Sequence, residues 1–202
     1  MASAFLRALG CDGDLGEFIV DMKGRARAKG GGHKVTGGGV GRIELESTRY
    51  PFCLEGNDKS SAGTRSIVPH FRFQQDLNRL TLRVRNLRTS KARVTWGEES
   101  REFSHGQLEA GINLAAEFSR TPFDQAFGKV LGAIAKKQEF ETQMIKGMVT
   151  QFRSFPAKDD AELAAAMAKV SERLAAHQQQ LDLAVRHAIE PVKHVVTVEP
   201  LE

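Results

Sequence analysis

The clearest strand pattern in this chain is Leu80-Thr-Leu-Arg-Val-Arg85, in which apolar and polar residues alternate. A period of two is typical of a strand with one face in a core and the other in water. The alternation recurs in three further segments, at Phe18, Val20 and Met22, at Ile43 and Leu45, and at Ala92, Val94 and Trp96. We therefore expect residues 11–103 to form a small antiparallel β-region.

The spacing of apolar residues changes to the 3.6-residue period of helices within residues 104–202. Ser104 and Gln107 match a capping box, which predicts a short helix at the start of this region. Two long amphipathic patterns follow, over residues 122–152 and 161–190.

The two long helices are separated by a short break that contains Pro156, so they are expected to form an antiparallel hairpin. Pro191 ends the second helix, and the segment from His194 to Val198 is interpreted as a final strand that returns to a sheet. The sequence thus predicts an α+β fold, with a small antiparallel β-region, a long antiparallel helical hairpin and a final strand.

The composition is that of an ordinary soluble protein, with 202 residues, 41% hydrophobic and 27% charged. No apolar run is long enough for a membrane-spanning helix, so a membrane partner is not expected. Residues 1–10 resemble the remnant of a helix, and Arg7 interrupts their apolar stretch, which argues against a signal peptide. The two cysteines exclude a disulfide scaffold, and nothing in the composition specifies a cellular compartment.

Four segments together resemble a known family. They are Tyr50-Pro-Phe-Cys53, Gln75-Asp-Leu-Asn-Arg-Leu-Thr-Leu82, Val94-Thr-Trp-Gly97 and Gly111-Ile-Asn-Leu-Ala-Ala-Glu-Phe118. In this order they resemble the C-terminal region of a bacterial branch of the SGNH (GDSL-type) hydrolases. The resemblance covers nearly the whole chain, and it implies an esterase-like protein whose catalytic core has a flavodoxin-like α/β/α fold.

The resemblance also shows which family motifs this sequence lacks. The family has a nucleophilic serine in a Gly-Asp-Ser block, a glycine and an asparagine for the oxyanion hole, and an Asp-x-x-His pair. Gly13-Asp14 is followed here by leucine, and the segment Met1–Phe5 would fall just after the catalytic histidine of the family. No catalytic residue of the family can be assigned here, so the resemblance implies a truncated hydrolase-like protein.

Three residues near the C-terminus have a spacing that suits a metal. His187, Glu190 and His194 would share one face of a continuous helix and would then be able to ligate zinc or another divalent metal. The alternative is that Pro191 ends the helix between them and that these side chains are simply solvated.

Other features have a structural and a functional interpretation. The glycine-rich segment Gly30–Gly39 suits a phosphate, but it matches no nucleotide-binding motif, and a hairpin loop is preferred. Cys53 lacks the spacing of a nucleophile with its base, so a buried cysteine is preferred, and His177 is expected to pack in the helical stripe. Residues 65–101 are rich in arginine, but nucleic acid is not the expected partner because the chain has one tryptophan and one tyrosine.

Three functions remain open at this point. The first is an accessory module of an SGNH-type hydrolase without its own triad. The second is a stand-alone hydrolase of small esters or phosphoesters that uses a non-serine, metal-dependent site. The third is a basic module that binds polyanions. A homo-oligomer, most simply a dimer, is expected because loss of the family core would leave Phe5, Leu6, Leu9 and part of the apolar stripe from Phe127 to Phe152 uncovered.

Overall fold

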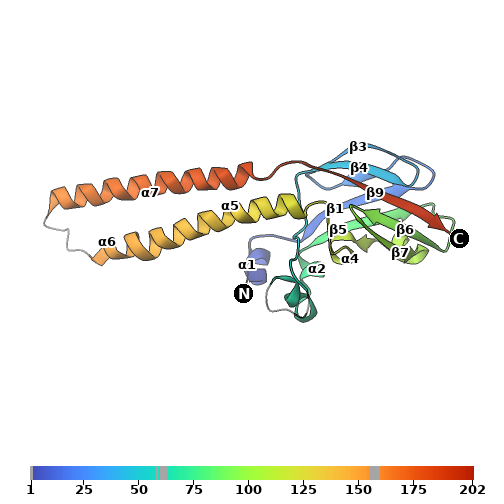
Figure 1. Cartoon of the computed structure of the whole chain (residues 1–202), viewed down its shortest axis with the longest axis horizontal. Coiled ribbons are helices and arrows are strands. Elements are labelled where there is room, and N and C mark those ends of the chain that lie inside the picture. The colour runs from blue at the N-terminus through green and yellow to red at the C-terminus, as the bar shows by residue number, and fades with distance from the viewer. Residues whose placement is uncertain (1, 58, 60–62, 155–159) are drawn as a thin grey trace. The chain divides into compact units, whose positions relative to one another are not determined.

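The computed structural model describes residues 2–57, 59, 63–154 and 160–202 of the chain. It divides into two compact units, one formed by Met1–Gln125 with Pro191–Glu202 and the other by Ala126–Glu190 (Figure 1). The first unit contains all of the described strands, and the second contains the long helices. The α+β fold class predicted from the sequence is confirmed.

The smaller of two sheets in the first unit has the strand order β2-β1-β5-β8. Its strands are β1 (Asp14–Asp21), β2 (Arg27–Lys29), β5 (Arg79–Arg85) and β8 (Ile112–Asn113). The strand β5 contains the alternating segment with which the prediction began, and its residues Leu80, Leu82 and Val84 are buried.

The pairing of β1 with β5 is parallel, and this corrects the expectation of a purely antiparallel β-region. Alternation in sequence shows which face of a strand is buried, but it does not show the direction of the neighbouring strand. Here the neighbours are separated by the three strands β2, β3 and β4, a connection long enough for a parallel pair.

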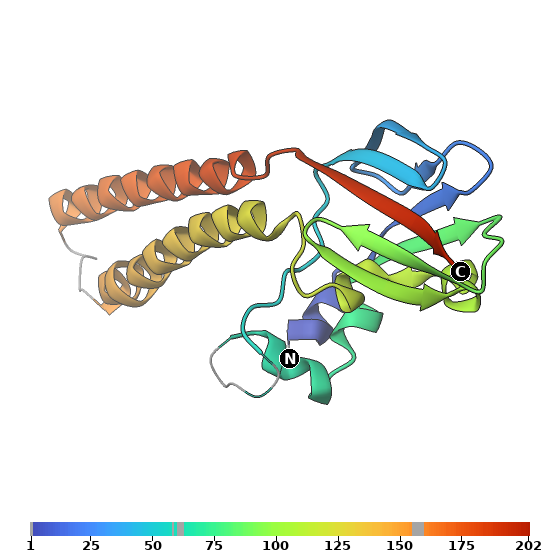
Figure 2. The same ribbon diagram turned by 45° about the vertical axis from the view of Figure 1, so that its right-hand side comes forward.

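The larger sheet has the order β3-β4-β9-β6-β7, and all of its pairs are antiparallel. Its strands are β3 (His33–Gly39), β4 (Arg42–Ser47), β6 (Lys91–Trp96), β7 (Glu99–Ser104) and β9 (Val192–Leu201). The C-terminal strand β9 lies between β4 and β6, as the red arrow shows in Figure 2. The predicted final strand is therefore confirmed, and it occupies the centre of this sheet.

The core of the first unit lies where the inner faces of the sheets meet, and aromatic side chains fill much of it. Trp96 is fully buried, and its ring centroid lies 5.8 Å from that of Phe118 and 6.0 Å from that of Phe123. Phe18 of β1 contributes a ring that lies 5.7 Å from the imidazole of His194 on β9. These contacts join residues of the two sheets across nearly the whole length of the sequence.

The first unit also contains short helices. They are α1 (Ala2–Ala8), the 3-10 helix η1 (Arg65–His70), α2 (Phe73–Asp76), α3 (His105–Ala110) and α4 (Leu114–Glu117). Of these, α2, α3 and α4 contact β5. The predicted capping box is present at α3, where the hydroxyl of Ser104 accepts from the backbone N–H of Gln107. Because α3, β8 and α4 pack within the first unit, residues 104–118 belong with the β-region in space.

The second unit is a hairpin of long helices. Its elements are α5 (Asp124–Gln143), the π-helical turn η2 (Met144–Val149), α6 (Thr150–Ser154) and α7 (Ala161–His187). Lys129 pairs with Glu190 at 3.0 Å, Lys137 with Asp182 at 3.1 Å, and Gln178 donates to Glu141 at 2.8 Å. From one pair to the next, the residue numbers rise along α5 and fall along the second helical segment, so the helices are antiparallel, as predicted.

The predicted break with Pro156 lies outside the described residues. None of the helices in the described part of the chain is long and apolar enough to cross a membrane.

Candidate functional site

His194, one of the three proposed metal ligands, lies inside the first unit on β9. Its side chain is 5% exposed, and both of its ring nitrogens have partners. Trp96 donates to Nδ1 at 3.2 Å, and the hydroxyl of Ser47 lies 2.9 Å from Nε2. With both nitrogens engaged in the core, His194 offers no free lone pair to a metal ion.

The other two proposed ligands, His187 and Glu190, lie at the end of the helical unit. The helix α7 ends at His187, so the continuous helical face that the metal prediction required stops before His194. Glu190 pairs with Lys129 of α5. Among the described residues, no three His, Cys, Asp or Glu side chains form a group that would hold a metal.

His194 belongs instead to a series of hydrogen-bonded side chains in the first unit, formed by Trp96, His194, Ser47 and His33, which we call the polar network. The hydroxyl of Ser47 on β4 lies 2.8 Å from Nδ1 of His33 on β3. Nε2 of His33 lies 2.7 Å from the carbonyl oxygen of Leu15 on β1. The polar network therefore runs from Trp96 through His194, Ser47 and His33 to β1 of the smaller sheet.

This polar network contains a serine between two histidines, but the serine and His194 are buried, and His33 is partly buried. Ser47 is 0% exposed, so no substrate can reach its hydroxyl without opening the unit. Burial is also the main cause that lowers the pKa of His194, to about 4, and it lowers the pKa of His33. The lowered pKa values and the burial of Ser47 and His194 fit side chains that stabilise the core rather than a catalytic site.

Cys53 lies in the core, as expected from the sequence. Its side chain is 8% exposed, and burial raises the pKa of its thiol to about 12. Its sulfur lies 3.5 Å from the hydroxyl of Thr121, which cannot serve as a base. A thiol in this state is not a nucleophile at neutral pH.

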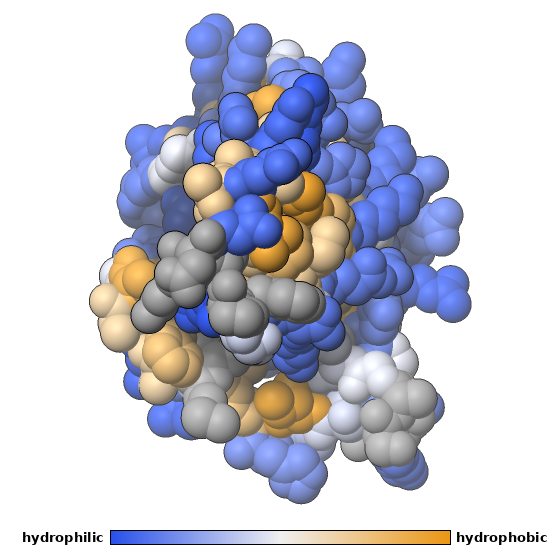
Figure 3. Space-filling view, turned by 90° about the vertical axis from the view of Figure 1, so that its left-hand side faces the viewer, coloured by the Kyte–Doolittle hydropathy of each residue, from blue (hydrophilic) through white to orange (hydrophobic). Residues whose placement is uncertain are grey.

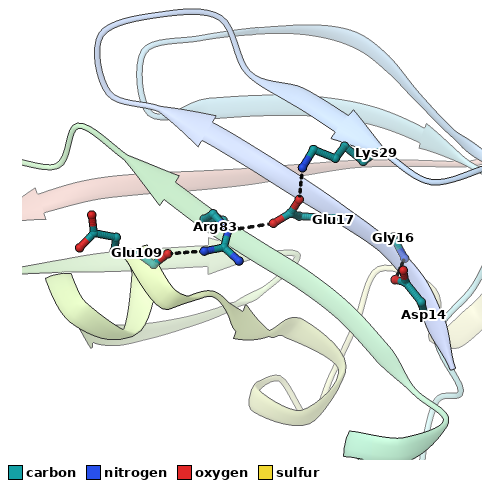
Figure 4. Close-up of polar contacts among 6 residues, drawn as sticks. All are labelled: Asp14, Gly16, Glu17, Lys29, Arg83 and Glu109. Atoms are coloured by element: carbon teal, nitrogen blue, oxygen red, sulfur yellow. Dashed lines mark hydrogen bonds and ion pairs between the residues drawn. The ribbon is translucent and has the colours of Figure 1, made fainter. Parts of the chain in front are cut away.

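Several basic residues of the β-region make internal contacts, and Arg83 is an example. Arg83 donates from Nε to Glu17 at 2.8 Å and from a terminal nitrogen to the carbonyl of Glu109 at 2.7 Å (Figure 4). Lys29 donates to the other oxygen of Glu17 at 2.8 Å. These bonds lower the pKa of Glu17 and hold Arg83 against β1, which weakens the case for a polyanion surface.

The glycine-rich segment is expected from the sequence to be a hairpin loop, but most of it is a strand. It forms the turn that follows β2 and the whole of β3, which makes a hairpin with β4. The turn between β3 and β4 requires glycine at position 41, because its φ is +70° and a Cβ there would approach the carbonyl oxygen of Val198 to 2.6 Å.

His177 packs in the hairpin, where its ring centroid lies 4.6 Å from that of Phe140. This agrees with its preferred interpretation as a packing residue.

Two asparagines from the distinctive sequence motifs have structural roles. Asn78 accepts from the backbone N–H of Phe52 at 2.8 Å and donates to the carbonyl of Phe52 at 3.0 Å. Asn113 donates to the carbonyls of Gln74 and Asn78, and Gln74 donates to the carbonyl of Ala115. This amide cluster ties residue 52 to the end of the smaller sheet.

An apolar pocket opens beside this amide cluster. Its volume is about 770 Å³, and its wall is formed by α1, the segment around Phe52 and residues 63–73. Phe52, Phe71 and Phe73 contribute three aromatic rings to it. An apolar pocket of this volume with a few polar groups in its wall is a typical small-molecule site, and we take it as the candidate functional site of this chain.

The sequence alone predicts neither this pocket nor the polar network. His194 shares the period-two face of Val196 and Val198, and this signal predicts its burial. No comparable signal links Ser47 to His33 or brings α1 to Phe52, because these contacts depend on pairing between segments far apart in sequence.

No protein-family model matches the chain, and no curated protein matches it. A solved structure described as a gut microbial diltiazem-metabolizing enzyme matches the whole chain with a TM-score of 0.65 and 19% sequence identity. The match takes up 53% of that enzyme, so this chain spans about half its length. At this identity the likeness shows a shared fold alone.

Proposed function

We propose that this chain is a non-catalytic accessory module of an SGNH-type hydrolase, corresponding to the part of such an enzyme that follows its catalytic core. The observation that carries the proposal is the fold match to an enzyme of about twice this length, which includes every part of this chain. The sequence motifs that resemble the SGNH family point in the same direction, because they match the C-terminal region of that family and none of its catalytic blocks.

The chemistry of the described residues supports a non-catalytic role. A serine hydrolase needs an accessible serine hydroxyl beside an imidazole that can take its proton. The chain places Ser47 between two imidazoles, but the hydroxyl is buried and one of the two histidines has a pKa of about 4. The buried thiol of Cys53 is equally unsuited to attack.

The substrate of the complete enzyme is proposed to be a small ester or phosphoester. The fold neighbour is described as metabolizing diltiazem, which is a small organic molecule, and this favours a small substrate over a polymer. The internal pairing of Arg83 with Glu17 also disfavours a nucleic-acid substrate.

An activity panel on the purified chain tests the proposal. Chromogenic acetate, butyrate and phosphate esters are each assayed with and without a chelator, and a fluorophosphonate probe reports any reactive serine. We expect no turnover above the rate without protein and no covalent labelling.

Two results would contradict the proposal. Turnover that chelation abolishes, and that His187→Ala or Glu190→Ala also abolishes, would establish a stand-alone metal-dependent hydrolase. Turnover that the fluorophosphonate probe abolishes while it labels a serine would establish a serine hydrolase. An exposed histidine on α3 of the first unit, His105, provides the matched control as His105→Ala.

A further inference from the structure

The apolar pocket of the first unit has the dimensions of a small-molecule site. Its volume of about 770 Å³ falls within the range of roughly 300–1,000 Å³ that is typical of ligand pockets. The apolar part of the wall consists of six side chains, Leu6, Phe52, Leu54, Ile67, Phe71 and Phe73. A cavity with this lining favours burial of an apolar molecule of similar size.

One wall of the pocket is held in place by the core. The rings of Phe52 and Phe73 meet edge to face with centroids 5.3 Å apart. The backbone of Phe52 is bound on both its N–H and its carbonyl by Asn78, which is fully buried. Leu54 is itself 8% exposed. A preformed wall of this kind lowers the ordering cost of binding.

The polar groups of the pocket restrict the chemistry of its ligand. The hydroxyl of Thr64 accepts from the backbone N–H of Glu55, and the hydroxyl of Ser66 donates to the carbonyl of Gly63. His70 adds an imidazole, which can donate or accept one hydrogen bond. None of the described residues of the lining carries a carboxylate, ammonium or guanidinium group, so none of them would compensate a buried charge on the ligand.

We propose that this pocket binds an uncharged aromatic small molecule that carries a single hydrogen-bonding group. Aromatic rings pack favourably against the edges and faces of other rings, and three phenylalanines are available here. Binding of this kind goes beyond the proposed accessory role, because it requires neither catalysis nor the rest of an enzyme.

A fluorescence titration with N-phenyl-1-naphthylamine, an uncharged aromatic probe, tests the proposal on the full chain. We expect saturable binding of one probe per chain with a Kd on the order of 100 µM or tighter. Ile67→Asp introduces a charge into the wall at a residue that is 48% exposed, so it should leave folding intact. It should weaken binding by at least about tenfold.

Ile189→Asp is the matched control, because Ile189 is 46% exposed and lies outside the pocket. It should leave the Kd within about twofold of the original value. A second variant acts from another wall: Ser3→Trp on α1 fills the pocket and should also weaken binding. Circular dichroism of each variant confirms that it remains folded.

Three outcomes would overturn the proposal. The first is a Kd unchanged by both Ile67→Asp and Ser3→Trp. The second is a titration that does not saturate or that Ile189→Asp weakens equally, since either would show nonspecific binding. The third is a dimer in the absence of probe that the probe dissociates, since the occupant of the pocket would then be a second copy of the chain. The ester and phosphoester panel is a separate measurement, so failure here leaves the accessory role untouched.

Discussion

Trp96 donates its indole N–H to Nδ1 of His194 over 3.2 Å, and both side chains are buried in the first unit. An indole nitrogen is a donor only, so Nδ1 of His194 must be the acceptor and its proton must lie on Nε2. That proton is then donated to the hydroxyl of Ser47, which donates in turn to Nδ1 of His33. Nε2 of His33 is left as the donor to the carbonyl of Leu15.

All four hydrogen bonds of the polar network are therefore donated in the same direction, from Trp96 toward Leu15. They require both imidazoles to be neutral. Protonation of His194 would place a second proton against the donor of Trp96, and protonation of His33 would place one against the hydroxyl of Ser47. The arrangement satisfies polar groups that join β1 to the larger sheet, and the described part of the chain has no buried side-chain N or O atom without a partner.

The first prediction is that mild acid destabilises the chain. The pKa of His194 is lowered to about 4 by burial and by the nearby His33, whose own pKa is also lowered. In the unfolded state both histidines titrate near their ordinary value of about 6.5. The contribution of the neutral histidines to the free energy of unfolding is therefore fully present above pH 6.5 and is lost as the pH falls toward 4. For His194 alone this loss is about 3 kcal/mol.

Urea unfolding at several pH values between 7.5 and 4.5 measures this loss. In the variant His194→Gln the slope of stability against pH should become shallower. His105→Gln removes an exposed histidine and should leave the slope as it is. A stability that is flat from pH 7.5 to 4.5 would show that the buried histidines do not titrate as proposed.

The second prediction concerns Trp96, the first hydrogen-bond donor of the polar network. Trp96→Phe leaves Nδ1 of His194 buried without a hydrogen-bond donor and also leaves a small cavity. The free energy of unfolding should fall by about 2–4 kcal/mol. Adding His194→Phe to this variant removes the orphaned acceptor, so the second change should cost less in this background than alone, and denaturant melts of the four proteins measure the difference. Equal costs in the two backgrounds would show that the two side chains do not interact.

The strands of this fold were predictable where burial alone decides the pattern. Leu80, Leu82 and Val84 alternate with polar residues, and the structure buries all three. The parallel neighbour of β5 was not predictable, because β1 lies more than fifty residues away and its own pattern is compatible with either direction. Ile19 gives a partial hint, since it is buried between Phe18 and Val20 and breaks the simple alternation that a one-sided strand would show.

The candidate sites depend still more on contacts between distant segments. The spacing of His187 and His194 predicted a shared helical face. His194 lies instead on β9, where it shares the buried face of the strand with Val196. The pocket combines α1 with residues 52 and 63–73, and each of these segments alone resembles an ordinary surface helix or loop.

The third prediction distinguishes the two cysteines. Cys11 is exposed, whereas burial raises the pKa of Cys53 to about 12. At pH 8 the thiolate population of Cys53 should be roughly a thousandfold smaller than that of an ordinary thiol. Alkylation by iodoacetamide followed by mass spectrometry should therefore modify Cys11 first and Cys53 only after denaturation. Rapid labelling of Cys53 in folded Cys11→Ser protein would show that the thiol is accessible and would reopen the nucleophile hypothesis.

The fourth prediction tests the ion pairs of the smaller sheet. Glu17 accepts from both Lys29 and Arg83 and has a side chain that is 20% exposed, so Glu17→Gln should lower the free energy of unfolding by about 1 kcal/mol. Glu102 also has two basic partners, but at longer distances and with a side chain that is 48% exposed. Glu102→Gln should therefore cause no measurable change in a denaturant melt, and equal losses from both variants would contradict this ranking.

The last prediction is the homodimer expected from the sequence, which the helical unit now makes specific. No described residue of α5 or α7 is buried, although the two helices together contain long apolar stripes. Leu163 and Val170 lie seven residues apart on α7, and each is more than a third exposed. Figure 3 shows apolar residues, in orange, between hydrophilic ones, in blue, on the face that is turned to the viewer. A second hairpin packed against the first would bury it in a four-helix arrangement.

Light scattering at micromolar concentration should therefore give the mass of a dimer. The double variant Leu163→Asp with Val170→Asp should give a monomer that keeps its helical circular dichroism, since both residues are exposed within one chain. Phe5→Asp changes a residue that is 67% exposed on α1 and should leave the dimer intact. A monomer for the unaltered protein at high micromolar concentration would exclude this dimer, and dissociation by Phe5→Asp alone would place its interface on α1 instead of on the hairpin.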